Sequence, residues 1–243
     1  MTDKLVMITV YDYPTACAFD QCGFDYFLVG DSVGMVELGM KDTKSVTMDM
    51  VLHHLKAVKR GTSKTHIVAD MPINTYDTPD TALENSRLFL EAGGNSVKLE
   101  GPVYKSTEML TSNDIKVIGH IGLTPQTAAD FKIRGTNEED ARRLKDEAKG
   151  LEQAGCFALI LEHMPASLAG EISETISIPT IGIGAGPLCG GQVLVSADLL
   201  GLYDRVPPFA KKYANLKEEM IKAGSAYIDE VKDGSFPSEE YYK

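Results

Sequence analysis

The feature that most constrains this chain is a regular alternation of short apolar runs with longer amphipathic segments. Most of the apolar runs are continuous, which is typical of strands that are buried on both faces of a sheet. Seven strands are predicted on this basis, at Val6–Tyr11, Tyr26–Gly30, His66–Asp70, Ser96–Glu100, Val117–His120, Ala158–Glu162 and Thr180–Gly184. An eighth, weaker strand is predicted near Arg205–Phe209.

The amphipathic segments between the strands are typical of helices, and several begin with a recognisable start signal. Thr47, Thr78 and Asn137 each precede such a segment and are suitable N-cap residues. Helices are predicted at Thr47–Arg60, Thr78–Ala92, Asn137–Ala154, Ser167–Ile176, Pro187–Leu202 and Asn215–Lys232.

Strands that alternate with helices in this way predict an α/β fold with a parallel sheet. The two candidate architectures are an open doubly wound sheet and a closed (β/α)8 TIM barrel. The steady strand spacing, and the absence of a G-x-G-x-x-G turn after the first strand, favour the barrel. The length of 243 residues is close to the usual size of such a barrel, so we expect a single catalytic domain over residues 1–243.

Charge and hydropathy limit the partners of the chain. It carries 35 Asp and Glu against 24 Lys and Arg, and the resulting net charge of -11 disfavours nucleic acid and anionic membrane surfaces. No apolar run approaches the length of a membrane span, and the first residues lack the pattern of a secretory signal. We therefore expect a cytoplasmic protein with small-molecule ligands and neither a nucleic-acid nor a membrane partner.

Ionisable side chains stand at the carboxyl ends of five consecutive predicted strands. They are Asp31 (followed by Ser32), Asp70, Lys98 with Glu100, His120 and Glu162. In a (β/α)8 barrel these strand ends meet at one mouth, where the active site lies. A single aspartate after a strand is most often only the N-cap of the next helix. Five such ends in a row favour instead a mutually compensating charged cluster around a cation, because unpaired charges are costly to bury.

The side chains of this cluster favour magnesium over zinc. Asp31, Asp70 and Glu100 supply hard carboxylate oxygens, and Mg²⁺ is typically held by one or two carboxylates together with water and substrate oxygens. His120 is the only imidazole in the cluster, which is too few for a zinc site.

Eight short motifs that span nearly the whole chain resemble those of one known family. In order they are ITVYDYPTA, LVGDSVGM, VTMDMVLHH, VADMP, VKLEG, GHIGLTPQ, ILEHMP and PTIGIGAG. With them the chain resembles the ketopantoate hydroxymethyltransferase family, (β/α)8 barrels of the phosphoenolpyruvate mutase and isocitrate lyase superfamily. The resemblance implies a homo-oligomeric enzyme of pantothenate biosynthesis, with Mg²⁺ as cofactor and 5,10-methylenetetrahydrofolate as cosubstrate.

The resemblance also implies a role for each residue of the charged cluster. The metal ligands would be Asp31, Asp70 and Glu100, the last directly or through water. The substrate contacts would be Asp31, Ser32, Asp70, Lys98 and His120, and the catalytic base would be Glu162. The implied reaction removes the C3 proton of 3-methyl-2-oxobutanoate, stabilises the enolate with Mg²⁺ and adds a hydroxymethyl group, giving 2-dehydropantoate.

Two alternatives stay open from the sequence. One is a different Mg²⁺-dependent 2-oxo acid enzyme of the same superfamily, a lyase or a hydrolase, that also forms an enolate. The other is a barrel that has lost catalysis and serves as a binding partner. The chain departs from the family's usual residues at Pro102, Gly190 and Ala197, and most of these departures are expected in loops around the mouth.

Overall fold

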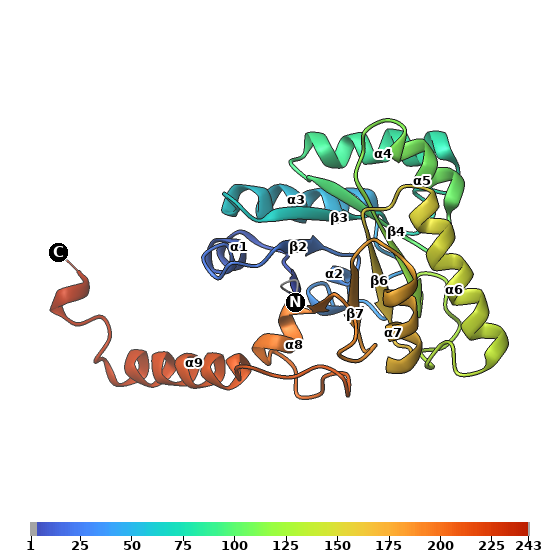
Figure 1. Cartoon of the computed structure of the whole chain (residues 1–243). Helices are drawn as coiled ribbons and strands as arrows, with labels where there is room; N and C mark the ends of the chain where they lie inside the picture. Colours follow the sequence, from blue (N-terminus) through green and yellow to red (C-terminus); the bar gives the residue numbers. More distant parts are fainter. Residues whose placement is uncertain (1–3, 243) are drawn as a thin grey trace. The chain divides into compact units, whose positions relative to one another are not determined.

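Eight strands close into a barrel in a computed structural model of the chain, which describes residues 4–242 (Figure 1). All neighbouring strands are parallel, and β8 pairs with β1 to close the barrel. The strands are β1 Leu5–Thr9, β2 Tyr26–Val29, β3 His66–Asp70, β4 Ser96–Glu100, β5 Val117–Gly122, β6 Ala158–Glu162, β7 Thr180–Ile183 and β8 Gly191–Leu194. The (β/α)8 fold predicted from the sequence is confirmed.

Helices follow β1 to β6, and all but the four-residue second helix are seen outside the strands (Figure 1). They are α1 Tyr13–Phe19, α2 Val33–Val36, α3 Met48–Gly61, α4 Pro79–Glu91, α5 Tyr104–Thr111, α6 Glu138–Gln153 and α7 Ala166–Thr175. The predicted N-caps are confirmed, because the side chains of Thr47, Thr78 and Asn137 accept backbone N–H groups of the first helical turns. The short helices α1, α2 and α5 were not predicted, since a few residues carry little periodicity.

The predicted eighth strand near Arg205–Phe209 is wrong, because these residues form turn and irregular structure. Pro207 and Pro208 lack the backbone N–H groups that a strand needs for its ladder. The eighth strand lies earlier in the chain, at β8.

The helix predicted at Pro187–Leu202 is also wrong over most of its length. Its middle is strand β8, and only Ser196–Leu200 is helical, as α8. Glycine suits the barrel closure here, since a Cβ atom at Gly191 would lie 2.5 Å from the carbonyl oxygen of Leu5. Such close approach of two backbones is a long-range property that helical periodicity does not reveal.

The chain divides into two compact units. The first ends at Leu194 and contains the barrel, and the second begins at Val195. The second unit contains α8, α9 at Leu216–Asp233 and a 3-10 helix at Glu239–Tyr241, and α9 confirms the last predicted helix. The prediction of one domain over residues 1–243 stays a prediction. Among the described helices, none has the length and apolar character needed to cross a membrane.

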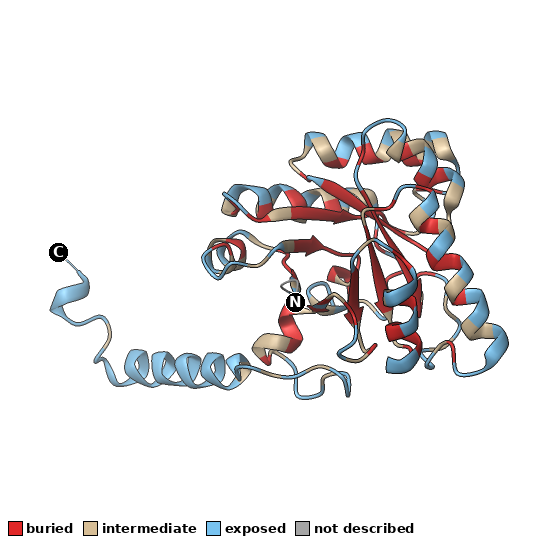
Figure 2. Cartoon of the chain, viewed as in Figure 1, coloured by how far each residue is buried: buried red, intermediate tan, exposed pale blue. Residues whose placement is uncertain are grey.

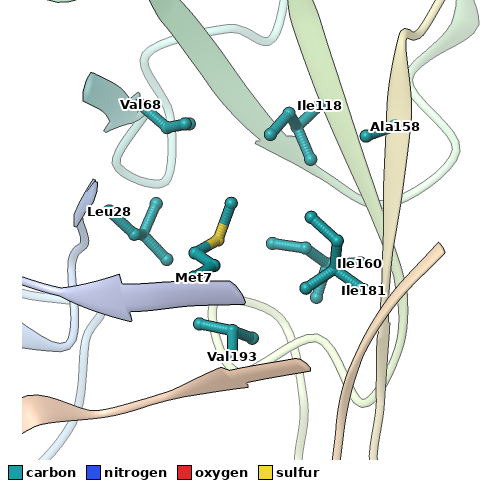
Figure 3. Close-up of a cluster of buried hydrophobic side chains, with 8 residues drawn as sticks. All are labelled: Met7, Leu28, Val68, Ile118, Ala158, Ile160, Ile181 and Val193. Atoms are coloured by element: carbon teal, nitrogen blue, oxygen red, sulfur yellow. The ribbon is translucent and has the colours of Figure 1, made fainter. Parts of the chain in front are cut away.

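Apolar side chains fill the inside of the barrel, whose strands are almost wholly buried (Figure 2, Figure 3). The cluster consists of Met7, Leu28, Val68, Ile118, Ala158, Ile160, Ile181 and Val193. Residues two positions apart on a strand share a face. Asp70, His120 and Glu162 each follow one of these core residues by two positions and therefore also point inward. The fold thus places ionisable side chains next to the apolar core, at the carboxyl ends of the strands.

Candidate active site

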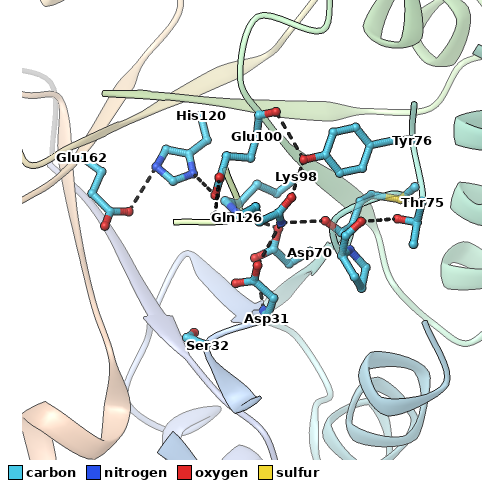
Figure 4. A network of polar contacts seen from close by, with 12 residues as sticks. Asp31, Ser32, Asp70, Thr75, Tyr76, Lys98, Glu100, His120, Gln126 and Glu162 are labelled. Atoms are coloured by element: carbon cyan, nitrogen blue, oxygen red, sulfur yellow. Dashed lines mark hydrogen bonds and ion pairs between the residues drawn. The ribbon is translucent and has the colours of Figure 1, made fainter. Parts of the chain in front are cut away.

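A buried ion pair joins β3 to β4 at the mouth of the barrel (Figure 4). Asp70 lies opposite Lys98 in the strand register, and the Nζ atom of Lys98 is 2.7 Å from Oδ1 of Asp70. The other oxygen of Asp70, Oδ2, accepts the backbone N–H of Asp31 at 3.2 Å. All three residues are buried, since Asp70 is 2% exposed, Lys98 4% and Asp31 6%. The ends of three strands are therefore joined in a buried polar network.

Gln126, in the loop between β5 and α6, extends this network to the next carboxylate. Its side-chain Nε2 donates to Oδ2 of Asp31 at 2.9 Å, and its backbone N–H donates to Oε1 of Glu100 at 2.9 Å. No role for Gln126 was predicted from the sequence. The only signal in the sequence was its place at the end of the GHIGLTPQ motif.

His120 lies between two carboxylates, Glu100 and Glu162 (Figure 4). Its Nδ1 is 3.4 Å from Glu100 Oε2 and its Nε2 is 3.1 Å from Glu162 Oε2; these are close ion-pair distances rather than well-aligned hydrogen bonds. Burial and Lys98 lower the pKa of His120, but Glu100 and Glu162 outweigh them and raise it to about 9. The imidazole is therefore cationic at neutral pH and holds the two carboxylates in place.

Ser32 follows Asp31 in the chain, but its side chain contacts Tyr11. Its hydroxyl is 2.7 Å from the hydroxyl of Tyr11, whose side chain is buried. His54 Nδ1 lies 2.7 Å from the Tyr11 carbonyl oxygen, which fixes the segment that follows β1. Burial raises the pKa of Tyr11, so its hydroxyl stays protonated. Tyr11 therefore orients Ser32 at the edge of the charged network.

The charged network contains an excess of buried negative charge. Asp31, Asp70 and Glu100 are each no more than 6% exposed. In the part of the chain that the structure describes, Lys98 is the one lysine that forms an ion pair with any of them, through Asp70. Burial raises the pKa of Asp31 well above its usual range, and the carboxylates of Asp70 and Glu100 add to this while Lys98 opposes it. A divalent cation would relieve this repulsion.

The donors of the network fit Mg²⁺ in one particular way. Across residues 4–242, no group of three or more His, Cys, Asp or Glu side chains is arranged to hold a metal ion by itself. Mg²⁺ commonly takes only one or two carboxylates and completes its shell with water and substrate oxygens. The buried carboxylate oxygens therefore fit an ion that is shared with a substrate, and not a closed structural metal site.

The predicted site residues are brought together with one exception. Asp31, Asp70, Lys98, Glu100, His120 and Glu162 form one continuous network of contacts, whereas Ser32 is turned towards Tyr11. Their individual roles as metal ligands, substrate contacts and base stay predictions.

Sequence comparisons agree with the motifs. The family model described as ketopantoate hydroxymethyltransferase matches residues 1–239. A protein of Oleidesulfovibrio alaskensis named 3-methyl-2-oxobutanoate hydroxymethyltransferase is 50% identical over 99% of this chain and 86% of its own length. A protein of the same name from Enterococcus faecalis is 51% identical, covering 98% of this chain and 90% of its own length.

Solved structures share the fold at low sequence identity. A phosphonopyruvate hydrolase in complex with oxalate and Mg²⁺ has a TM-score of 0.64 and 12% identity, covering 98% of this chain and 88% of that one. A 2,3-dimethylmalate lyase, described as a member of the PEP mutase and isocitrate lyase superfamily, has a TM-score of 0.62 and 16% identity, covering 99% and 87%. At these identities the likeness supports the barrel alone. From its motifs, its match to the family model and its relatives, this chain belongs to the ketopantoate hydroxymethyltransferase family.

Proposed function

We propose that this chain transfers a hydroxymethyl group from 5,10-methylenetetrahydrofolate to 3-methyl-2-oxobutanoate and forms 2-dehydropantoate. The acceptor follows from the family, and the one-carbon donor is carried over from the family resemblance. The observation that carries the chemistry is the network of buried carboxylates, lysine and imidazole at the barrel mouth. Formation of an enolate needs fixed positive charge near the developing oxyanion and a base near C3.

The acid-binding part of the site consists of the carboxylates and Lys98. Asp31 and Asp70 would hold Mg²⁺, with Glu100 as a third ligand directly or through water. When bound, Mg²⁺ would supply the positive charge that polarises the keto group of the acid. Lys98 adds a permanent positive charge beside Asp70, at 2.7 Å, and Ser32 and His120 contact the substrate in this proposal.

Glu162 is the proposed base. Its side chain is 17% exposed, more than its neighbours in the network, and its carboxylate is 3.1 Å from Nε2 of His120. One side is therefore open towards a substrate while the imidazole holds the other. Glu162 takes the C3 proton, and the electron pair of the C–H bond moves into the enolate. Water cleaves both C–N bonds of the folate's methylene bridge, which releases tetrahydrofolate with a proton on each freed nitrogen and leaves formaldehyde. The enolate carbon then bonds to the formaldehyde carbon, the C=O electron pair moves to its oxygen, and that oxygen takes the proton held by Glu162 and becomes the hydroxyl group.

The lyase and hydrolase alternative has less support. The structures of such enzymes share only the fold with this chain, at 16% identity or below in the two compared above. The family model matches almost the whole chain and favours hydroxymethyl transfer. A cytoplasmic location and a homo-oligomer remain predictions from the sequence and the resemblance.

A transfer assay tests the proposed reaction. The protein is incubated with 3-methyl-2-oxobutanoate, 5,10-methylenetetrahydrofolate and Mg²⁺, and the product is followed by mass spectrometry. We expect product only when all three are present, and its loss when a chelator is added. Product that forms equally well without the folate would contradict the proposal, as would no product from the folded, unmodified protein.

A pair of matched variants assigns the base. Glu162→Gln keeps the size of the side chain and removes its ability to take a proton, so we expect about 10²- to 10⁴-fold slower transfer. Glu174→Gln makes the same change on the exposed surface of α7 and is expected to leave the rate unchanged. Circular dichroism of both variants checks that they are folded.

A further inference from the structure

Gln126 is a buried residue that contacts two of the proposed metal ligands. The residue is only 1% exposed. It donates to the carboxylates of both Asp31 and Glu100 at 2.9 Å, the first through its side chain and the second through its backbone. We infer that Gln126 is a positioning residue, which holds these two carboxylates in the arrangement that binds the divalent cation. The inference rests on the proposed function.

The amide of Gln126 has only one orientation that satisfies its surroundings. Nε2 faces two acceptors, Oδ2 of Asp31 and the carbonyl oxygen of Met71 at 3.0 Å. Oε1 accepts a hydrogen bond from the hydroxyl of Tyr76. A flipped amide would place its oxygen against the oxygens of Asp31 and Met71 and lose both of these hydrogen bonds. Tyr76 therefore fixes Gln126, and Gln126 in turn presents an N–H group to Asp31.

Tyr76 is itself held firmly. Its side chain is 6% exposed, its hydroxyl also lies 3.3 Å from the carbonyl oxygen of Glu100, and its own carbonyl accepts a hydrogen bond from Ser106 at 2.9 Å. The chain of contacts from Ser106 through Tyr76 and Gln126 to Asp31 is visible in part in Figure 4. It connects α5 to the end of β2 through buried polar groups.

The carboxylates of Asp70 and Asp31, two of the proposed metal ligands, are held by different kinds of hydrogen-bond donor. Asp70 is fixed by the ammonium of Lys98 and by the backbone of Asp31. The side chain of Asp31 is instead fixed by the neutral amide of Gln126, which donates a hydrogen bond without adding charge. A neutral donor orients the carboxylate and leaves its full negative charge for a cation. Outer partners of this kind typically change metal affinity by about 10- to 100-fold when they are removed.

The inference is tested by the affinity for Mn²⁺, used as a spectroscopic substitute for Mg²⁺ and measured by electron paramagnetic resonance in the presence of 3-methyl-2-oxobutanoate and without folate. Gln126→Met keeps the length of the side chain and the backbone N–H but removes the amide, so we expect at least about tenfold weaker binding. Tyr76→Phe removes the hydroxyl that orients the amide, and we expect a smaller loss in the same direction. The double variant is expected to bind no more weakly than Gln126→Met, because Tyr76 acts through Gln126.

Gln21→Met is the matched control, since Gln21 is exposed and its amide contacts only the carbonyl oxygen of Cys17 among the hydrogen bonds of the described residues. It should bind Mn²⁺ as the unmodified protein does. Unchanged affinity in a folded Gln126→Met variant would overturn the inference and leave the proposed function intact. Absence of Mn²⁺ binding by the unmodified protein would overturn both. If Gln126→Met does not fold, unchanged affinity in Tyr76→Phe overturns the inference.

Discussion

Lys98 is a buried cation whose neighbours are carboxylates of adjacent strand ends. Its ammonium is paired with Asp70 at 2.7 Å, and Asp31 and Glu100 lie near enough to raise its pKa together with Asp70, although burial acts in the opposite direction. A buried pair of this kind stabilises little by itself, but removal of one partner leaves the other as an uncompensated charge.

We therefore expect Lys98→Met to lower the free energy of unfolding by about 3–5 kcal/mol at neutral pH. Mg²⁺ should restore part of this loss, since a cation would again balance the carboxylates. Urea unfolding with and without Mg²⁺ measures both effects. Lys149→Met, an exposed change on α6, is the control. Equal stability of Lys98→Met and this control would show that the carboxylates do not depend on the lysine.

Asp20 connects the end of α1 to the segment before β3, away from the charged network. It follows α1, and its carboxylate accepts the backbone N–H groups of Ser63 and Thr65, at 3.0 Å each, in the segment between α3 and β3. The hydroxyls of the same two residues also donate to it. Burial by itself raises the pKa of Asp20, but these hydrogen bonds outweigh it and hold the pKa well below its usual range.

A lowered pKa means that Asp20 stabilises the fold when it is ionised. Its contribution is complete above the unfolded pKa of about 3.9 and is lost as the pH falls towards the lower pKa of the folded state. We expect Asp20→Asn to cost about 2 kcal/mol near pH 7, and we expect this difference to shrink in acid. Unfolding of the two proteins at several pH values measures it, with Asp146→Asn on the exposed side of α6 as control. A difference that grows as the pH falls would contradict this account.

The closure of the barrel between β1 and β8 depends on Gly191. A Cβ atom there would lie 2.5 Å from the carbonyl oxygen of Leu5, so Gly191→Ala forces the two strands apart. We expect a loss of about 1–3 kcal/mol in the free energy of unfolding. Gly224→Ala is the same substitution in α9, where no atom lies within 4 Å of the added Cβ, and it should be neutral or stabilise by up to about 1 kcal/mol. Equal effects of the two changes would contradict the close approach.

The sequence predicts some elements better than others, because only some of them are specified by a local pattern of residues. Apolar runs that end in an ionisable residue predicted β3 to β6 and placed Asp70, Glu100 and Glu162 at the mouth. The brief strand β8 carries little local signal, since it has four residues and begins with Gly191. It is specified by its pairing with β1 and β7, which no local pattern records.

The same distinction applies inside the site. Parallel strands in sequence order bring their carboxyl ends together, and the register then sets Asp70 opposite Lys98 and Glu100 opposite His120. Gln126 reaches the network from a loop and contacts Asp31, a residue 95 positions away. The path of a loop depends on its tertiary contacts, and the role of Gln126 was therefore not predictable. Gly190, one of the departures from the family pattern, does not lie in a loop around the mouth. It precedes the first residue of β8, at the opposite end of the barrel.

Helix α9 is the element that bears on the assembly of the whole molecule. Met220, Tyr227 and Ile228 place apolar side chains on one face of α9, because residues seven and eight positions apart lie on the same side of a helix. An apolar helix face of this kind needs an apolar surface to pack against. Together with the family resemblance, this favours the predicted homo-oligomer.

Light scattering after size-exclusion chromatography should therefore give a mass of two or more times 26.4 kDa. Replacing both Tyr227 and Ile228 by Lys places charge on the apolar side of α9 and should lower that mass. Asp229→Lys changes the charge on the polar side of the same helix and should leave it unchanged. A mass of 26.4 kDa for the unmodified protein at micromolar concentration would contradict the prediction.

The central claim is that the charged network at the barrel mouth makes an enolate from a 2-oxo acid. Incubation with 3-methyl-2-oxobutanoate and Mg²⁺ in D₂O, without folate, isolates that step from transfer, and NMR follows the C3 proton. The account predicts exchange of this proton for deuterium that depends on Mg²⁺, disappears in Glu162→Gln and persists in Glu174→Gln. No exchange by the folded, unmodified protein would contradict it, as would exchange that continues unchanged in Glu162→Gln.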